Sequence, residues 1–286
     1  MLFRSMRLWS PDALPPLPPL RLAVVGHVEW VTFLAVDTLP AAGRIGHAQR
    51  VLEEPAGGGA VVAVQLARLL AQPVPFFTAL GRDAVGERAA QRLGELGLDL
   101  QVAWREQPTR RGISFVDGHG DRSITVIGER LTPAAADPLP WEQLASCDGV
   151  FVTAADAGAL LHCRAASVLA ATPRLGLPLL QGAAVTLDAL IGSGLDPGEA
   201  VPDGALAPAP ALRIATEGAA GGVTMPGGRF AAPVLTEAAV DSYGCGDSFA
   251  AGVTAGLAAG WSVEQAVSLG SHCGAACISR FGPYGT

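Results

Sequence analysis

Short, continuously apolar runs alternate with amphipathic stretches along most of the chain. The runs "LRLAVVG" (20–26) and "GVFVTA" (149–154) are typical of strands that are buried on both faces, and shorter runs recur at 188–193 and 212–218. Helix-compatible segments lie between some of them. Strands that alternate with helices predict an α/β fold with a mostly parallel sheet, whose ligands bind at the carboxyl ends of the strands.

Two helices are predicted in the first third of the chain. The stretch "AVVAVQLARLLA" (60–71) is apolar on nearly every side and follows three glycines, which indicates a buried helix after a tight loop. The stretch 83–97 has apolar residues on one face only. Asp83 suits its N-cap and Gly97 the position after its end.

A third helix follows the segment "DSYGCGD" (241–247). From Asp247 onward, apolar side chains recur every fourth residue, and Gly260 is a natural stop. The turn Gly244-Cys245-Gly246 therefore lies at a helix N-terminus, where free N–H groups and the helix dipole attract anions. Asp247 either caps this helix or acts as a base beside a bound phosphate.

One region has the two-residue period of an antiparallel hairpin. The stretches "ISFVD" (113–117) and "RSITVIG" (122–128) flank a glycine turn. A hairpin inside an α/β chain predicts a flap or lid beside the main sheet. Arg110, Arg111 and Arg122 flank this hairpin; they are within reach of a phosphorylated substrate, but exposed hairpin charge is the commoner explanation.

Composition narrows the function classes. The chain has 286 residues, half of them hydrophobic, which is enough for one large domain or two small ones. A net charge of -7 argues against nucleic acid and anionic membranes as main partners, while small anionic substrates stay open. All 19 basic residues are Arg. The absence of Lys excludes a Walker A phosphate loop and Schiff-base chemistry.

Cysteines and the N-terminal region point to a compartment. The five cysteines form no C-x-x-C pair, which favours buried thiols in a reducing compartment over a disulfide framework. Residues 1–20 are Pro-rich and contain no signal-peptide apolar run, so we expect a loose tail. No window of about 18 apolar residues predicts a membrane span. We therefore expect a soluble, cytoplasmic protein.

The histidines show no metal-ligand spacing and are interpreted as core, loop or surface residues: His27, His47, His119, His162 and His272.

Four segments, in order, resemble the ribokinase/PfkB family of carbohydrate and nucleoside kinases. The segment 241–247 resembles the family's C-terminal signature D-T-x-G-A-G-D, and "AGGGAVVAVQLARL" (56–69) its Gly-rich N-terminal signature. The segment 79–99 is similar to the family's vGxDxxG motif region, and 117–126 to its lid hairpin. The resemblance covers about residues 21–286.

The resemblance implies a fold and an activity. The fold is a ribokinase-like α/β domain over 21–286, with a central, mostly parallel sheet flanked by helices and a small β-sheet lid from about 29–55 and 109–130. The activity is ATP-dependent transfer of the γ-phosphate to a hydroxyl of a sugar or sugar-like molecule. Asp247 corresponds to the catalytic base, and the Gly244-Cys245-Gly246 turn, with the Asp247 amide, to the anion hole.

The resemblance also assigns binding residues. In "ATEGAAGG" (215–222), the candidates for ATP contact are Thr216, Gly218 and Gly221, together with Gly244 and Gly246; the alternative is an ordinary strand-to-hairpin turn. The candidates for substrate contact are Glu29, Gly57, Gly58, Gly59 and Asp247. A monovalent cation near Asp241 and a homodimer through the lid are further implications.

Three positions depart from the family pattern. Val31 stands where an Asp usually holds substrate hydroxyls, but Glu29, two residues earlier on the same strand face, can supply a displaced carboxylate. Val61 stands where an Asn is usual. In place of N-x-x-E, the chain has Asp196-x-x-Glu199, which suits Mg²⁺ held through water but is also a common turn sequence. The two valines predict a substrate that is less polar than ribose or differently shaped.

Two alternatives to a sugar kinase stay open. Loss of two polar groups makes room for a base, which favours a nucleoside kinase. A catalytically weak ligand-binding or regulatory homologue is the other alternative, because Val31 and Val61 indicate drift while the intact 244–247 cluster indicates catalysis. In each case the expected ligands are a small molecule and ATP, with neither nucleic acid nor membrane as a partner.

Overall fold

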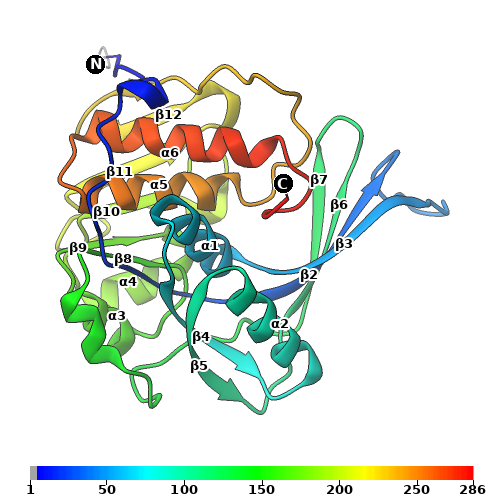
Figure 1. Ribbon diagram of the computed structural model, residues 1–286, viewed down its shortest axis with the longest axis horizontal. Helices are drawn as coiled ribbons and strands as arrows, with labels where there is room; N and C mark the ends of the chain where they lie inside the picture. The colour runs from blue at the N-terminus through cyan, green and yellow to red at the C-terminus, as the bar shows by residue number, and fades with distance from the viewer. Residues whose placement is uncertain (1–4, 286) are drawn as a thin grey trace.

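The computed structural model describes residues 5–285, which form two sheets with helices on both sides of the larger one (Figure 1). The larger sheet has the order β13-β12-β11-β10-β9-β8-β1-β4-β5, and the smaller has the order β3-β2-β6-β7. Pairing is parallel from β11 through to β5, and the β11–β12 and β12–β13 pairs are antiparallel. The α/β class, the mostly parallel sheet and the small lid sheet predicted from the sequence are confirmed.

The strands are β1 (Leu22–Val25), β2 (Glu29–Val36), β3 (Ala48–Ala56), β4 (Val74–Gly81), β5 (Leu98–Arg105), β6 (Arg111–Val116), β7 (Arg122–Ile127), β8 (Gly149–Val152), β9 (Val168–Ala171), β10 (Ala189–Ser193), β11 (Leu212–Thr216), β12 (Gly222–Met225) and β13 (Arg229–Phe230). The α-helices are α1 (Gly58–Leu70), α2 (Ala84–Glu95), α3 (Ala157–Cys163), α4 (Leu177–Ala183), α5 (Cys245–Ala258) and α6 (Val263–Ile278). Short 3-10 helices are η1 (Pro11–Ala13), η2 (Trp141–Ser146), η3 (Pro173–Leu175), η4 (Pro197–Glu199) and η5 (Gly218–Ala220).

The continuous apolar run of β1 is explained by burial on both faces of the sheet. Leu22 and Val24 pack into the cluster on the side of α1, α5 and α6, whereas Ala23 and Val25 pack into the cluster on the side of α3 and α4. Alternate residues of a strand point to opposite faces, so a strand covered on both sides needs apolar side chains throughout.

The helices begin and end where the sequence predicts them. The Asp83 carboxylate caps α2 by accepting a 2.7 Å hydrogen bond from the Gly86 amide, and Gly97 follows the helix with a φ of 89°. Helix α5 begins at Cys245, after Gly244 in the left-handed conformation, and Gly260 follows its end with a φ of 73°. Left-handed backbone suits Gly, because it has no Cβ.

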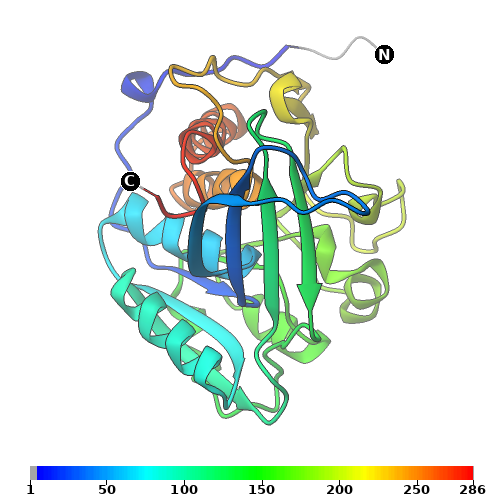
Figure 2. The ribbon, with the colours of Figure 1, turned by 90° about the vertical axis from the view of Figure 1, so that its right-hand side faces the viewer.

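The smaller sheet projects from one side of the molecule and faces the viewer in Figure 2. Its strands β6 and β7 form the predicted antiparallel hairpin, and β6 also pairs in parallel with β2. Strand β7 is exposed along its whole length and carries three exposed apolar side chains, Ile124, Val126 and Ile127. This edge of the lid sheet therefore presents unpaired backbone groups and apolar surface to solvent.

The Pro-rich segment is not loose in its described part, residues 5–20. Ser5 forms a β-bridge with Arg229, and the Met6 amide donates a 2.7 Å hydrogen bond to the Arg229 carbonyl. Trp9 bonds through its amide to Ser268 and through its carbonyl to His272, both on α6. These contacts correct the expectation of a loose tail. The domain boundary near residue 20 stays a prediction.

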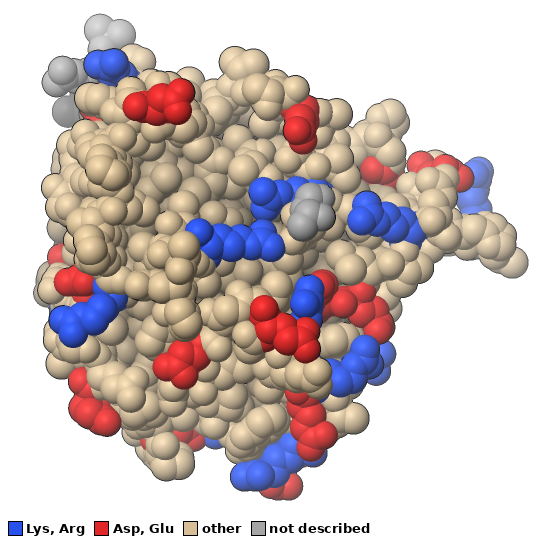
Figure 3. All heavy atoms as spheres, viewed as in Figure 1, with Lys and Arg blue, Asp and Glu red and all other residues tan. Residues whose placement is uncertain are grey.

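Across residues 5–285, the structure contains no helix long and apolar enough to span a membrane. The five cysteines are all unpaired, with Cys245 partly buried and the other four buried. On the face shown in Figure 3, acidic and basic side chains are interspersed rather than gathered by sign.

Candidate functional site

The carboxyl ends of the parallel strands meet along one edge of the large sheet, and the site lies there. His27 follows β1, Thr153 follows β8, and Arg174 follows β9. Thr216 ends β11 at the same edge. Between β1 and β11 lie three strands, so these ends are about 19 Å apart at the usual strand spacing. The edge therefore has room for two ligands placed end to end.

The N-terminal turn of α5 is built as an anion site. Gly244 has a φ of 80°, and its missing Cβ would lie 2.9 Å from the Val61 side chain. The Cys245 amide makes only a long, 3.4 Å bond to the Ser242 carbonyl, and the Gly246 and Asp247 amides donate no hydrogen bond to any described residue. A Cβ on Gly246 would meet nothing within 4 Å. Open space above unpaired N–H groups at a helix start is suited to a phosphate.

Asp247 lies in the first turn of α5, partly buried, and does not cap the helix. The N-cap residue is Gly244, and the Asp247 carboxylate accepts no hydrogen bond from residues 5–285. Burial raises its pKa to about 6, with the positive charge of Arg122 opposing the shift. An acid with an unoccupied carboxylate and a pKa near neutrality is suited to accept a proton. The cap alternative is not supported.

Glycines 57–59 bring a second helix N-terminus against Asp247. A Cβ on Gly58 would lie 2.9 Å from Asp247 Oδ1, and Gly57, with a φ of 85°, lies against the His27 ring. Gly59 instead packs closely on the His27 backbone. Of the three predicted substrate glycines, Gly57 and Gly58 therefore face the site, whereas Gly59 fits α1 onto the end of β1.

Tyr243 and Asp241 hold this segment in place. The Gly57 amide donates a 3.1 Å hydrogen bond to the Tyr243 hydroxyl, which joins the two helix starts. The Asp241 carboxylate is buried and accepts hydrogen bonds from the Tyr243 amide at 2.8 Å and the Gly282 amide at 3.0 Å. Both of its oxygens are thus engaged by backbone, which gives Asp241 a structural role whether or not a cation binds.

Glu29, at the start of β2, is buried beside basic groups. Its Oε1 lies 3.1 Å from Arg110 Nε and 3.8 Å from His27 Nε2, and its side chain is 9% exposed. Burial raises the pKa of Glu29, opposed by the charge of Arg110. The solvated alternative for Glu29 is thereby removed. The Glu29 side chain lies next to Gly57, with its Cγ 3.3 Å from where a Cβ on that glycine would be.

His27 was expected to be an ordinary core or loop histidine, but it lies within the site. It is 6% exposed, and its Nδ1 lies 3.4 Å from Thr153 Oγ1. Burial lowers its pKa to about 3, and the charges of Arg130 and Arg110 lower it further. His27 is therefore neutral at pH 7, and contributes a hydrogen-bonding group rather than a charge.

The two valines that replace polar residues are both buried. Val31 is fully buried in β2, and its side chain lies 3.2 Å from where a Cβ on Gly112 would be. Val61, on α1, packs against Gly244. They make the walls beside Glu29 and beside the α5 turn apolar.

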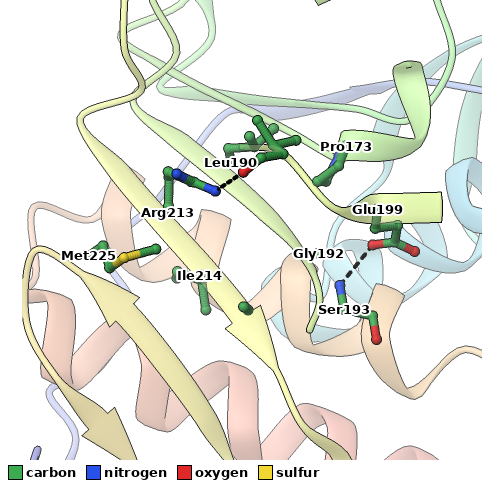
Figure 4. Close-up of a pocket in the computed structure, with 10 residues that line it drawn as sticks. Pro173, Leu190, Gly192, Ser193, Glu199, Arg213, Ile214 and Met225 are labelled. Carbon is green, nitrogen blue, oxygen red and sulfur yellow. Dashed lines mark hydrogen bonds between the residues drawn. The ribbon is translucent and has the colours of Figure 1, made fainter. Parts of the chain in front are cut away.

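Asp196 and Glu199 are ion-paired with one arginine. Arg174 Nε lies 2.7 Å from Glu199 Oε1, and the same guanidinium contacts the Asp196 carboxylate. Glu199 also accepts a 2.7 Å bond from the Ser193 amide, drawn in Figure 4 at the edge of a cavity of about 50 Å³ between β10 and β11. That cavity is too small for a nucleotide or a sugar. Within residues 5–285, no three His, Cys, Asp or Glu side chains could hold a metal together.

The predicted nucleotide segment adopts the strand-to-hairpin turn that was its alternative interpretation. Gly221 has a φ of 85°, and a Cβ there would lie 2.0 Å from the Phe230 carbonyl, so packing of the hairpin already requires Gly. Gly218 has a φ of 60° and open surroundings, with Leu195 the nearest side chain at 3.8 Å from a Cβ. The Thr216 hydroxyl donates to the Gly192 carbonyl at 3.3 Å. The turn leaves Gly218 accessible for contact with a ligand.

Three arginines converge on this site, and the sequence analysis weighed only Arg110 among them as a contact for a phosphorylated substrate. Arg110 was interpreted as exposed hairpin charge, but its side chain is only 14% exposed. Arg130 and Arg174 were not considered. The Arg130 Nη1 donates to the Arg174 carbonyl at 3.3 Å. Arg174 lies three residues after the end of β9, a strand that the sequence analysis did not predict, and Arg130 carries no local signal either.

The fold and this site define a kinase of the ribokinase-like class, a phosphotransferase with an alcohol group as acceptor. The sequence profile described as pfkB family carbohydrate kinase matches residues 20–172 and 203–286, more than half of the chain. The chain belongs to this family. The unmatched stretch, 173–202, contains Arg174 and the Asp196-x-x-Glu199 motif, where the family's N-x-x-E pattern is also missing.

The chain is also similar to individual kinases. The chain is 27% identical over 281 residues to an ATP-dependent ribose-1-phosphate kinase of Halopiger xanaduensis, with 92% of this chain and 93% of that protein covered. Among solved structures, the adenosine kinase of Sinorhizobium meliloti superposes with a TM-score of 0.72 at 20% identity, covering 93% of this chain and 96% of that one. The Arabidopsis thaliana ribokinase complexed with ribose and ATP gives a TM-score of 0.67 at 18% identity, covering 91% and 93%.

Proposed function

We propose that this protein transfers the γ-phosphate of ATP to a hydroxyl of a sugar or sugar-like molecule, with Asp247 as the general base. The observation that carries the proposal is the Asp247 carboxylate. It is partly buried, has a pKa of about 6, accepts no hydrogen bond within the described chain, and lies beside the open anion turn of α5.

The chemistry follows from the arrangement of these groups. The acceptor hydroxyl gives its proton to Asp247 as its oxygen forms a bond to the γ-phosphorus, and the bond from that phosphorus to the β-phosphate oxygen breaks to release ADP. Gly246 and Asp247 point unpaired amides at the transferring phosphoryl group, and the Cys245 amide adds a third N–H. Glu29 and the Gly57-Gly58 turn hold the acceptor. The Cys245 thiol stays protonated, because its hydrogen bond with the Cys277 thiol and its burial raise its pKa.

Metal ions are proposed in outer-sphere roles. Asp196 and Glu199 are oxygen donors that suit Mg²⁺, but both contact Arg174, so we propose that they bind waters of a Mg²⁺ carried by the ATP phosphates. Bound there, Mg²⁺ would neutralise charge on those phosphates. A monovalent cation near Asp241 would bind neighbouring carbonyls, since both Asp241 oxygens already accept backbone hydrogen bonds.

Two alternatives to a sugar kinase can each be judged from specific residues. A nucleoside acceptor is favoured by the buried Val31 and Val61, which leave apolar walls where a base could pack. A ligand-binding homologue with weak turnover would need the same pocket without proton transfer, which the accessible Asp247 carboxylate argues against. We place the protein in the cytoplasm.

MgATP is expected to raise the melting temperature. A ligand that binds only the folded state stabilises it by about 2.7 kcal/mol at one hundred times its Kd. Thermal melts with millimolar MgATP, and with sugars, polyols and nucleosides added one at a time, measure this effect and identify acceptors through a further rise. A melting temperature that stays constant through the whole panel contradicts both kinase alternatives.

A homodimer formed through the lid is the expected assembly. The exposed edge strand β7, with Ile124, Val126 and Ile127, supplies unpaired backbone groups and apolar surface for a second copy. Light scattering at micromolar concentration should give twice the monomer mass, and Val126→Lys should shift the mass toward the monomer. A monomeric wild-type protein removes the dimer and leaves the kinase proposal intact.

A further inference from the structure

Two arginines of the site lack a full set of partners. The Nε atoms of Arg110 and Arg130 are both buried from solvent and make no hydrogen bond within residues 5–285. Arg110 has the ion-pair contact with Glu29, at 3.1 Å. Arg130 has no carboxylate partner among the described residues; its one hydrogen bond goes to the Arg174 carbonyl. A guanidinium N–H that is buried without an acceptor is costly.

The two arginines lie in the same part of the fold. The backbones meet at the base of the lid hairpin, where a Cβ on Gly128 would lie 3.9 Å from the Arg110 Cα, two residues before Arg130. Their charges also act on a common neighbour, because both lower the pKa of His27. Burial lowers the pKa of Arg130, and the charge of Arg110 adds to that shift. Since Arg does not deprotonate in proteins, the two side chains stay charged and are suited to bind an anion.

The carboxylates nearby do not supply that charge. Glu29 is engaged by Arg110, whereas Asp196 and Glu199 are engaged by Arg174. These pairings leave Arg130 with no carboxylate in contact among the described residues, and the Arg110 fork only partly used.

We propose that the acceptor substrate is itself a phosphate monoester, whose phosphate is held by Arg110 and Arg130 while Asp247 takes the proton from a separate hydroxyl. This inference rests on the proposed kinase function. Guanidinium forks match phosphate oxygens in geometry and charge. The position of Arg110 beside Glu29, at the base of the lid hairpin, favours the acceptor over the nucleotide as the source of the phosphate. The product would carry two phosphate groups.

The test compares neutral sugars with their own phosphates. Ribose, ribose 1-phosphate, ribose 5-phosphate, fructose, fructose 1-phosphate, fructose 6-phosphate, adenosine and gluconate are assayed as acceptors with MgATP. At least one sugar phosphate should exceed its parent sugar about 100-fold in kcat/KM, since each hydrogen bond to a charged group is worth about tenfold or more. Equal or better use of neutral sugars or adenosine, or a preference for gluconate, overturns the inference while leaving the kinase function standing.

Two substitutions, Arg130→Gln and Arg130→Met, test whether Arg130 holds the acceptor's phosphate. Either change should raise KM for the sugar phosphate about 10- to 100-fold, and change kcat/KM for the parent sugar less than twofold. Both variants should melt no lower than wild type, because they remove a half-buried charge that contacts no carboxylate among the described residues. Arg111→Gln is the matched control, one residue from Arg110 but exposed, and should behave as wild type. Equal losses on both acceptors would indicate a merely structural Arg130 and overturn the inference.

Calorimetry measures, without any turnover, whether Arg130 binds the phosphate of the acceptor or that of the nucleotide. Without nucleotide, the wild-type protein should bind the preferred sugar phosphate, and Arg130→Gln should weaken that binding about 10- to 100-fold. MgADP affinity should be unchanged in the variant. A loss of MgADP affinity with unchanged sugar-phosphate affinity would assign Arg130 to the nucleotide and overturn the inference. This binding arm gives a result even if no acceptor is phosphorylated, which would be the failure of the proposed function instead.

Discussion

Asp247→Asn is expected to lower turnover by about 10² or more, the usual scale of general base catalysis, while the protein remains folded and binds ATP. The amide cannot accept the hydroxyl proton, whereas the Gly246 amide and its neighbours stay in place. Wild-type kcat should fall as the pH drops through about 6, the pKa of Asp247. Steady-state kinetics of both proteins from pH 5 to pH 8 measure these effects.

The same substitution should raise the stability at neutral pH. The pKa of Asp247 is raised from 3.8 to about 6 in the folded protein, so its favourable contribution is fully present below about pH 4 and is lost as the pH rises through 6. At pH 7–8 the ionised carboxylate therefore costs about 1–3 kcal/mol, a cost that Asn does not carry. Melting curves should show the gain at pH 8 and its disappearance at pH 4.

Asp156→Asn is the matched control for Asp247→Asn. Asp156 caps α3 by accepting a 2.7 Å hydrogen bond from the Ala159 amide, and Asn caps about as well as Asp. This control should alter neither turnover nor stability appreciably. If Asp247→Asn behaves in the same way, with turnover near wild type, Asp247 is not the base and the proposed mechanism is wrong.

Gly246→Ala is expected to separate stability from activity at the anion turn. Gly246 is in the first turn of α5, and an added methyl meets no atom within 4 Å, so the helix gains up to about 1 kcal/mol from the better helix former. The methyl would stand in the space through which a phosphate approaches the unpaired amides. We expect kcat/KM for ATP to fall about 10²-fold, the scale for losing one oxyanion donor.

Gly94→Ala is the comparison for that change. Gly94 is exposed in α2, and a Cβ there also meets nothing within 4 Å. It should give a similar rise in melting temperature with unchanged kinetics. Unchanged kcat/KM in Gly246→Ala would mean that no phosphate approaches this turn, and would exclude the anion-hole assignment.

The elements that the sequence predicted are those with a strong local signal. Buried strands such as β1 are continuous in apolar residues, α2 has Asp83 at its start, and the lid hairpin has a two-residue period. Most of the candidate site also lies in short local motifs that the sequence analysis could recognise. Two of them, Gly244–Asp247 and Gly57–Gly58, lie against each other in the structure.

The residues that were missed depend on distant parts of the chain. His27 gains its position because β1 lies between β4 and β8, with Thr153 on the neighbouring strand end. Arg130 follows the lid hairpin and is half-buried because distant residues, such as Arg174, lie against it. The contacts of residues 5–20 with α6 lie more than 250 positions away in sequence, beyond the reach of any periodicity.

The packing of residues 5–20 has a practical consequence for preparing the protein. The sequence of this segment predicted a loose tail, yet its Ser5 forms a β-bridge with Arg229 of β13. The next residue of β13, Phe230, has its carbonyl against Gly221 in the candidate nucleotide turn. Trimming the gene to begin at Leu20 would leave the Arg229 carbonyl without its amide partner, and would uncover Ser268 and His272 on α6. Expression plasmids for this enzyme should therefore keep the segment, and affinity tags should be separated from Ser5 by a flexible spacer.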